Sequence, residues 1–295
     1  MAQIIDGKAI AADIRQELKQ KVIDFESTYH IKPCLAVIIV GDDPASQVYV
    51  RNKQKACEEI GFRSIVLKHP ANETEANLLM AIDGLNNNPD IHGILVQLPL
   101  PKHLNEEKIL LAINPKKDVD AFHPKNVGRL MLGNPSFKPC TPAGVLELLK
   151  RSNVDIAGKE CVIVGRSNIV GKPLAMMLLQ ENGTVTICHS KTKDLYKHTQ
   201  RADILISAIG KAEFFDSAAN IKPGAVVIDV GINRTETGKL VGDVKFENVI
   251  DRVAAITPVP GGVGPMTIAM LMQNTLEAAI YAASNTSNGE FTTDF

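Results

Sequence analysis

The chain has 295 residues, 45% of them hydrophobic, and its 32 basic and 33 acidic residues give a formal net charge of −1. This length is enough for about two domains. The balanced charge creates no field that would attract nucleic acid or an anionic membrane, so neither is expected as a partner. The first residues meet a charged side chain before any long apolar stretch, unlike a signal peptide, and no run of about 18 apolar residues occurs. These features predict a soluble, cytoplasmic protein.

The cysteines and histidines give no sign of a disulfide framework or a metal site. Cys34, Cys57, Cys140, Cys161 and Cys188 are scattered, odd in number and without a C-x-x-C pair. The seven histidines show no spacing typical of metal ligands. We therefore expect buried reduced thiols and no bound metal.

Strands and helices are predicted to alternate in the first part of the chain. Apolar residues at spacings of three and four, from Ile10 to Phe25, indicate a helix. Ser46 is a candidate N-cap of the next helix, and Gly61 is expected to end it. The predicted elements are helix 8–29, strand 35–40, helix 46–60, strand 64–67, helix 74–85, strand 93–98 and helix 105–113.

A second alternation follows a segment rich in glycine and proline, residues 114–137, where loops are expected. The predicted elements are helix 145–150, strand 161–164, helix 174–179, strands 184–188, 202–208, 224–231 and 253–256, a loop over 257–265 and an apolar helix from residue 266. The pattern predicts an α/β protein of two domains with open, mostly parallel sheets, separated by a cleft.

The predicted domain boundary lies near residues 139–142. The first domain is expected to cover residues 1–140 and the second, Rossmann-like domain residues 141–265. The helix over 266–283 is expected to return to the first domain, and residues 284–295 form a polar tail that is expected to be disordered.

The turn after strand 161–164 has the parts of a phosphate-binding site. Gly165 and Gly171 enclose it, and Pro173 suits the first turn of the helix that follows. The N–H groups and the positive dipole end of such a helix face the turn and attract phosphate. The spacing departs from G-x-G-x-x-G, so an ordinary strand-to-helix turn is an alternative from the motif alone.

The residues after strand 184–188 distinguish between two dinucleotides. A site specific for NAD places a carboxylate here for the ribose 2′-hydroxyl, whereas this chain has His189, Ser190 and Lys191. Hydroxyls and cations suit a 2′-phosphate, and Arg166 could add a charge-assisted hydrogen bond to it. The sequence therefore predicts that the second domain binds NADP.

Six segments carry motifs that recur in one known family. They are residues 49–53, 93–99, 117–120, 139–142, 165–171 and 257–267. Together they resemble the bifunctional family of methylene-tetrahydrofolate dehydrogenase and methenyl-tetrahydrofolate cyclohydrolase. The resemblance implies oxidation of 5,10-methylene-tetrahydrofolate with NADP, hydrolysis of the methenyl product to 10-formyl-tetrahydrofolate, and a homodimer.

The resemblance also implies three catalytic residues, Lys53, Gln97 and Asp120. Tyr49 and Lys53 are four residues apart and share one face of their helix. In the family the tyrosine stacks on the folate, the lysine takes part in proton transfer and the aspartate binds the pterin. Because a lysine has an ordinary pKa of about 10.4, burial or neighbouring groups would have to lower it. Without the resemblance, a surface lysine beside a half-buried tyrosine is the simpler interpretation.

Further binding residues follow from the same resemblance. The substrate-binding residues are Ser46, Tyr49, Pro260, Gly261 and Gly264, and the cofactor-binding residues are Gly165, Arg166, Ser167, Ile169, Ser190, Gly210, Ile232 and Thr267. Two positions depart from the family pattern. Ala121 replaces the usual glycine and Ala212 a common proline, which leaves the shape of both loops open.

Two other functions are compatible with parts of the sequence. A dehydrogenase of the shikimate or amino-acid type would share the nucleotide domain but gives no reason for Tyr49, Lys53, Gln97 and Asp120 to occur together. A non-enzymatic, NADP-responsive binding module would keep the second domain and leave Lys53 without a role.

Overall fold

The computed structural model describes residues 2–287, which divide into two compact units. Unit 1 contains the residues up to Ala12, Leu130–Asn134 and Pro139–Met270, and unit 2 contains Asp13–Arg129, Pro135–Lys138 and the chain from Leu271. The predicted two-domain α/β fold is confirmed. Two long helices, α1 (Gly7–Tyr29) and α10 (Val263–Ser287), each contribute residues to both units.

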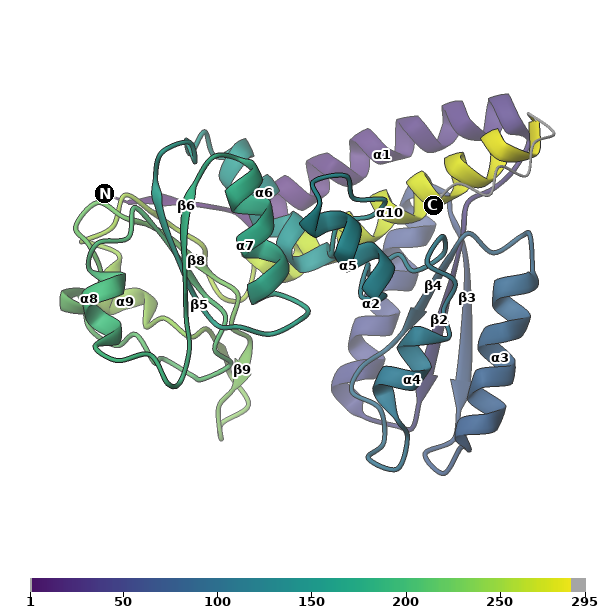
Figure 1. Ribbon diagram of the computed structural model, residues 1–295, viewed down its shortest axis with the longest axis horizontal. Coiled ribbons are helices and arrows are strands. Elements are labelled where there is room, and N and C mark those ends of the chain that lie inside the picture. The colour runs from purple at the N-terminus through teal and green to yellow at the C-terminus, as the bar shows by residue number, and fades with distance from the viewer. Residues whose placement is uncertain (1, 288–295) are drawn as a thin grey trace. The chain divides into compact units, whose positions relative to one another are not determined.

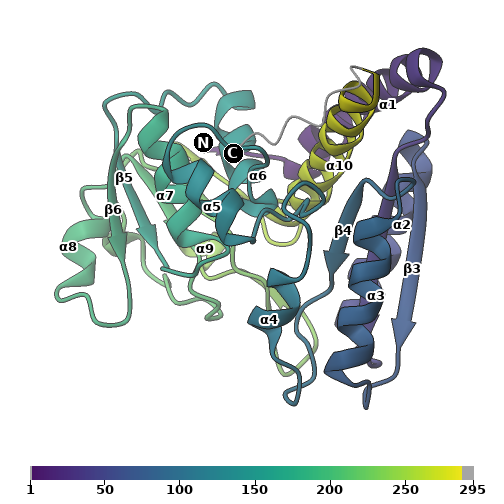
Figure 2. The ribbon, with the colours of Figure 1, turned by 45° about the vertical axis from the view of Figure 1, so that its right-hand side comes forward.

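Unit 2 is built on a three-stranded parallel sheet in the order β3–β2–β4. The middle strand is apolar and buried over its whole length, as expected for a strand covered on both faces. Alternate residues of β2 pack against side chains of α3 and α4, which lie along the sheet in Figures 1 and 2. The elements are β2 (Cys34–Val40), α2 (Pro44–Ile60), β3 (Arg63–His69), α3 (Glu75–Asn87), β4 (Gly93–Val96) and α4 (Glu106–Leu111).

Unit 1 is built on a six-stranded parallel sheet in the order β1–β11–β8–β7–β5–β6. Its strands are β1 (Gln3–Ile4), β5 (Glu160–Val164), β6 (Thr184–Cys188), β7 (Ile204–Ser207), β8 (Val226–Asp229) and β11 (Ala255–Ile256). Its helices include α6 (Cys140–Arg151), α7 (Gly171–Gln180), α8 (Leu195–Thr199) and α9 (Phe246–Val249). Leu195 of α8 and Phe246 of α9 pack on one core of the sheet, and Figure 1 shows α6 and α7 on its other side. β9 (Asn233–Arg234) and β10 (Leu240–Val241) form a separate antiparallel pair.

Several short elements were not predicted from the sequence. In β1, Gln3 pairs with Ala255 of β11, so these first residues join the sheet of unit 1, although the prediction placed them in the first domain. Helix α5 (Pro124–Met131) lies in a segment predicted to form loops. Val127, Leu130 and Met131 do have helical spacing, but the glycines and prolines in and around the segment favoured a loop.

Several helix ends differ from the prediction. The N-cap of α2 is Asp43, whose carboxylate accepts a hydrogen bond from the Ser46 N–H at 2.7 Å, so the predicted N-cap at Ser46 is wrong. Helix α10 begins at Val263, inside the predicted loop 257–265, and α6 begins at Cys140 rather than near Val145. Because α10 continues to Ser287, the predicted disorder is wrong for residues 284–287, and residues 288–295 lie outside the described residues.

Candidate active site

Lys53 and Gln97 meet in unit 2. Lys53 lies on α2 with only 9% of its surface exposed, and its Nζ donates a hydrogen bond to Gln97 Oε1 at 3.0 Å. Gln97 directly follows β4, and its Nε2 donates to the Leu98 carbonyl at 2.7 Å, which fixes the side of the amide that faces the lysine. Tyr49, one helical turn before Lys53, is 40% exposed. Two of the three predicted catalytic residues, Lys53 and Gln97, are therefore in contact, and the accessible Tyr49 ring lies on the same helix face as Lys53.

The side chains of Lys117 and Asp118 anchor the segment 117–120. The Lys117 Nζ donates hydrogen bonds to the Leu85 and Asn88 carbonyls at the end of α3. Asp118 is 3% exposed and accepts hydrogen bonds from the His123 N–H and the Asn126 amide, so its carboxylate holds this segment in place. Burial raises the pKa of the Asp118 carboxyl, although these hydrogen bonds oppose the shift.

Asp120 lies at the same end of β4 as Gln97. A parallel bridge between Ile94 and Asp118 brings the segment 117–120 alongside β4, and the two segments then run in the same direction. The Asp120 side chain is half-buried. The following residue, Ala121, is fully buried and has a φ of 60°, in the left-handed region that glycine adopts without strain. The alanine at this position thus keeps the backbone conformation that a glycine would adopt easily.

The turn between β5 and α7 closes tightly on itself. A Cβ atom at Gly165, whose φ is 143°, would lie 2.3 Å from the Ala208 carbonyl oxygen, and one at Gly171 would lie 2.2 Å from the Gly165 oxygen. Both glycines are therefore required by close backbone approach. Ser167 Oγ accepts from the N–H groups of Val170 and Gly171, at 3.1 and 3.3 Å. The hydroxyl thereby pairs with two N–H groups where α7 begins, while Arg166 and Ile169 are exposed.

Arg166 and Ser190 follow two neighbouring strands. Val164 at the end of β5 pairs with Cys188 at the end of β6, so both residues emerge from the same edge of the parallel sheet, and both are exposed. The turn after β6 is fixed by Thr192, whose hydroxyl accepts from the His189 N–H at 2.8 Å. The next carboxylate along the chain, Asp194, is bonded to Lys197 at 2.8 Å. The residues at this edge suit a 2′-phosphate better than a 2′-hydroxyl.

The other predicted cofactor residues lie at the carboxyl edge of the same sheet. Gly210 follows β7 and Ile232 follows β8. Gly264 and Thr267 lie in the first turns of α10, and a Cβ at Gly264 would lie 3.5 Å from Ile232 Cδ1. Pro260, Gly261 and Gly264 were predicted to bind substrate rather than cofactor; Pro260 and Gly261 precede this helix, after β11. Ligands of parallel α/β sheets bind at this edge.

Comparison with known protein families agrees with this geometry. A model of the catalytic domain of tetrahydrofolate dehydrogenase/cyclohydrolase matches residues 5–120, and a model of the NAD(P)-binding domain of the same enzymes matches residues 139–283. The chain belongs to this family. Membership supports the first predicted function rather than the two alternatives.

Relatives and solved structures of the family resemble the chain over most of its length. "Bifunctional protein FolD" of Acetivibrio thermocellus is 60% identical over 94% of this chain and 97% of that protein. The FolD crystal structure from Campylobacter jejuni is 53% identical, with a TM-score of 0.92 over 95% of this chain and 99% of its own. The FolD structure from Trypanosoma brucei, solved with NADP cofactor and inhibitor, is 43% identical, with a TM-score of 0.91 over 95% and 98% of the two chains.

Three buried polar side chains near the predicted sites of this family member were missed in the sequence analysis. Asp229 is the last residue of β8 and is 2% exposed, and Asp243 lies after β10 and is 0% exposed. Asn274 is 4% exposed within α10. Asp229 stands alone in an apolar stretch, and that isolation was an available signal, because a buried polar group must find partners. Asn274 lies between Gln273 and Thr275, so no such signal exists there.

No helix of the described residues is long and apolar enough to cross a membrane. Residues 2–287 also contain no group of three or more histidine, cysteine or acidic side chains that could hold a metal ion.

Proposed function

We propose that this protein oxidises 5,10-methylene-tetrahydrofolate with NADP and hydrolyses the methenyl product to 10-formyl-tetrahydrofolate. The observation that supports this most directly is the buried Lys53, held by an uncharged amide oxygen at 3.0 Å in the domain that matches the family's catalytic domain. The hydrogen bond to Gln97 fixes the position of the Lys53 amine, which can then exchange protons with a water molecule at the substrate.

In the hydrolytic step, Lys53 is proposed to move the protons. As the oxygen of a water molecule bonds to the methenyl carbon, the Lys53 amine accepts a proton from that water. When the bond between this carbon and the N5 nitrogen breaks, the same amine returns a proton to the departing nitrogen, and the hydroxyl on the carbon releases its remaining proton to solvent as the formyl C=O forms. Gln97 is proposed to hold the Lys53 amine in place through both transfers.

The substrate is proposed to be oriented by residues of the same unit. Asp120 offers carboxylate oxygens to the donor N–H groups of a pterin, and the exposed ring of Tyr49 offers a stacking surface. Ser46 lies one turn before Val50 on the same helix and is 4% exposed, so we propose that it shapes the base of the site. Holding the folate in one orientation supplies much of the rate acceleration of a hydride transfer.

NADP, when bound, accepts the hydride from the methylene carbon. We propose that Arg166 and Ser190 hold its 2′-phosphate, since both are exposed at the edge where the strands β5 and β6 end. Gly165, Ser167 and Ile169 form the turn beneath the phosphates, and Gly210, Ile232 and Thr267 line the adjoining edge.

The experiment that tests this proposal assays the two half-reactions of the purified protein separately. Hydrolysis of methenyl-tetrahydrofolate is measured without cofactor, and oxidation of methylene-tetrahydrofolate is measured with NADP and with NAD. We expect both reactions, with NADP preferred in the second. A protein that binds NADP but hydrolyses no methenyl-tetrahydrofolate would contradict the proposal and favour another dehydrogenase or a binding module.

We also propose that the protein is a cytoplasmic homodimer that binds neither nucleic acid nor membranes. The balanced charge of −1 supports the lack of such partners, and the family resemblance supports the dimer. Light scattering coupled to size-exclusion chromatography measures the oligomeric state, and a mass near the 31.9 kDa of one chain would contradict the dimer.

A further inference from the structure

The Asp243 carboxylate is completely buried and accepts hydrogen bonds from five donors. Its Oδ2 accepts from Ser207 Oγ at 3.1 Å and from the N–H groups of Ile209 and Gly210 at 2.7 and 3.3 Å. Its Oδ1 accepts from the Lys211 N–H at 2.9 Å and from Asn233 Nδ2 at 3.0 Å. With 0% of its surface exposed, this carboxylate depends on these donors to replace its hydration.

The donors come from two loops at the carboxyl edge of the sheet in unit 1. Residues 209–211 follow β7, and three consecutive backbone N–H groups of this loop converge on one side chain. Asn233 begins β9, directly after Ile232, in the loop that follows β8. A single carboxylate therefore fixes the conformation of both loops.

The loop after β7 lies against the glycine turn between β5 and α7. The Ala208 carbonyl approaches Gly165 so closely that a Cβ there would lie 2.3 Å from its oxygen. Residues 208–211 and the turn thus border the same place at the sheet edge, where a dinucleotide binds in folds of this kind. A shift of the loop would displace one wall of that site.

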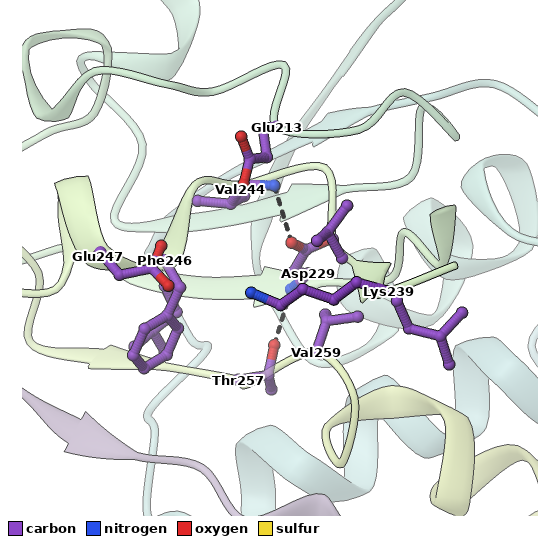
Figure 3. A pocket seen from close by; sticks show the side chains of 12 residues that line it. Glu213, Asp229, Lys239, Val244, Phe246, Glu247, Thr257 and Val259 are labelled. Atoms are coloured by element: carbon purple, nitrogen blue, oxygen red, sulfur yellow. Dashed lines mark hydrogen bonds between the residues drawn. The ribbon is translucent and has the colours of Figure 1, made fainter. Parts of the chain in front are cut away.

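The surrounding structure is shaped to accommodate the carboxylate. A Cβ at Gly231 would lie 2.2 Å from Asp243 Oδ1, so only glycine fits there. The backbone of Asp243 is held in turn, since its N–H donates to Asp229 Oδ1 at 3.0 Å. Figure 3 shows the Asp229 side chain at the base of a hollow, with the Val244 N–H donating to Oδ2 at 2.8 Å.

We propose that Asp243 is a positioning residue for the dinucleotide: it does not touch the cofactor but holds the loops after β7 and β8, including Gly210 and Ile232, in the shape that binds NADP. This inference rests on the NADP site of the proposed function. It predicts that disturbing Asp243 weakens cofactor binding and oxidation while the cofactor-independent hydrolysis in the other domain continues.

The test measures three quantities for the wild-type protein and for Asp243→Asn. They are the Kd for NADP, the KM and kcat of the oxidation, and the hydrolysis of methenyl-tetrahydrofolate without cofactor. The asparagine amide turns an N–H₂ group toward donors, which leaves buried groups unpaired. We expect the Kd and KM for NADP to rise about 5- to 150-fold while hydrolysis is unchanged. A wild-type protein that fails to bind NADP would overturn the proposed function instead.

Asp203→Asn is the matched control. Asp203 lies just before β7, at the opposite edge of the same sheet, where it accepts from the Glu160 N–H and pairs with Lys222. The same substitution there should leave NADP affinity unchanged. Equal losses of NADP affinity in both variants would indicate general destabilisation of the domain and overturn the proposal, as would unchanged affinity in Asp243→Asn.

A milder variant decides the question if Asp243→Asn does not fold. Ser207→Ala removes one hydrogen bond to Asp243 Oδ2 from within β7 and leaves the two loops intact. We expect NADP affinity to fall several-fold, by about the effect of one hydrogen bond, with hydrolysis unchanged. Wild-type NADP affinity in Ser207→Ala would overturn the proposal in that case.

Discussion

Asn274 of α10 donates hydrogen bonds from Nδ2 to the Val119 carbonyl at 2.7 Å and to the Lys138 carbonyl at 2.8 Å. Val119 directly precedes Asp120, so the C-terminal helix holds the backbone on which the proposed pterin ligand stands. A family resemblance at residues 117–120 does not reveal this support, since it comes from a helix 155 positions away in the sequence.

Replacing Asn274 by leucine should therefore weaken folate binding. The side chain is 4% exposed, and the change leaves the buried Val119 carbonyl without this bond, at about 1 to 3 kcal/mol, and the partly buried Lys138 carbonyl at a smaller cost. We expect a lower free energy of unfolding and a higher KM for the folate in both reactions. Gln273→Leu is the control, because Gln273 is only partly buried and bonds to Glu277 one turn away. Equal effects from the two variants would contradict a specific role for Asn274.

Lys53→Met should abolish most of the hydrolysis without disturbing the fold. Methionine keeps an unbranched stem in the buried position and removes the amine that bonds to Gln97. We expect the rate of methenyl hydrolysis to fall about 10²-fold or more, the usual effect of a general acid–base group. The control is Lys55→Met, which lies two residues further along α2 and is exposed. Hydrolysis near the wild-type rate in Lys53→Met would show that another group moves the proton.

Arg166→Ala should reduce selectivity for NADP over NAD. A charge-assisted hydrogen bond contributes about 1.5 to 3 kcal/mol, so the KM for NADP should rise about 10- to 150-fold while NAD kinetics barely change. Arg201→Ala serves as the control, because Arg201 is also exposed in unit 1 but bonds to Thr186 within β6. If both cofactors weakened equally in Arg166→Ala, the guanidinium would hold the pyrophosphate shared by the two.

The sequence predicted the spacing-dependent features of the site well. Tyr49 and Lys53 share a helix face because of the helical repeat, and Arg166 and Ser190 meet at one sheet edge because consecutive strands of a βαβ unit are neighbours and parallel. The contact between Lys53 and Gln97 joins residues 44 positions apart, and only the family resemblance suggested it.

The features that the sequence analysis missed depend on contacts that distant residues make. The convergence of residues 207–211 and Asn233 on Asp243 spans 10 to 36 positions, and no periodic pattern encodes it. The N-cap of α2 was different, because Asp43 followed by Pro44 is itself a local signal for a helix start and was overlooked in favour of Ser46. Local sequence patterns were therefore sufficient to predict most helices and strands, but not the long-range hydrogen bonds that hold the loops of the site.

The stability of the protein should depend on pH through Asp229. Burial raises the pKa of this carboxyl from 3.8 to about 7, and the nearby Asp243 adds to the shift. Between these values the folded protein retains a proton that the unfolded chain loses. The stabilisation is thus complete below about pH 4 and is lost as the pH rises through about 7.

Asp229→Asn should remove this dependence, because an amide does not ionise in this range. Urea unfolding at about pH 5 and about pH 8 should show the wild-type protein losing on the order of a few kcal/mol relative to the variant. Asp203→Asn is the control and should keep the same change in stability between these two pH values as the wild-type protein. The hydrogen bond from Lys222 lowers the pKa of Asp203, so the contribution of Asp203 to stability changes only at acidic pH. Parallel pH profiles for wild type and Asp229→Asn would refute the assignment.

Asp120 and Ala121 should differ in how strongly their substitution affects folate binding. Asp120→Asn keeps the size of the side chain but turns N–H groups toward donors of the pterin, so both reactions should weaken together, with folate affinity falling by the equivalent of about 1 to 3 kcal/mol per unpaired group. Stability should change little, because the side chain is only half-buried.

Ala121→Gly should change either activity less than Asp120→Asn does. Glycine relieves the left-handed φ of 60° by about 1 kcal/mol, but it also loses a buried methyl group and gains chain entropy in the unfolded state, each of similar size. These contributions nearly cancel, so the free energy of unfolding should shift by less than about 1 kcal/mol. Ala121→Val should instead be strongly destabilising, because a β-branched residue rarely adopts this conformation. Folate affinity, both activities and urea unfolding of the three variants decide between the roles: a larger loss of activity from Ala121→Gly than from Asp120→Asn would mean that the loop backbone, and not the carboxylate, recognises the pterin.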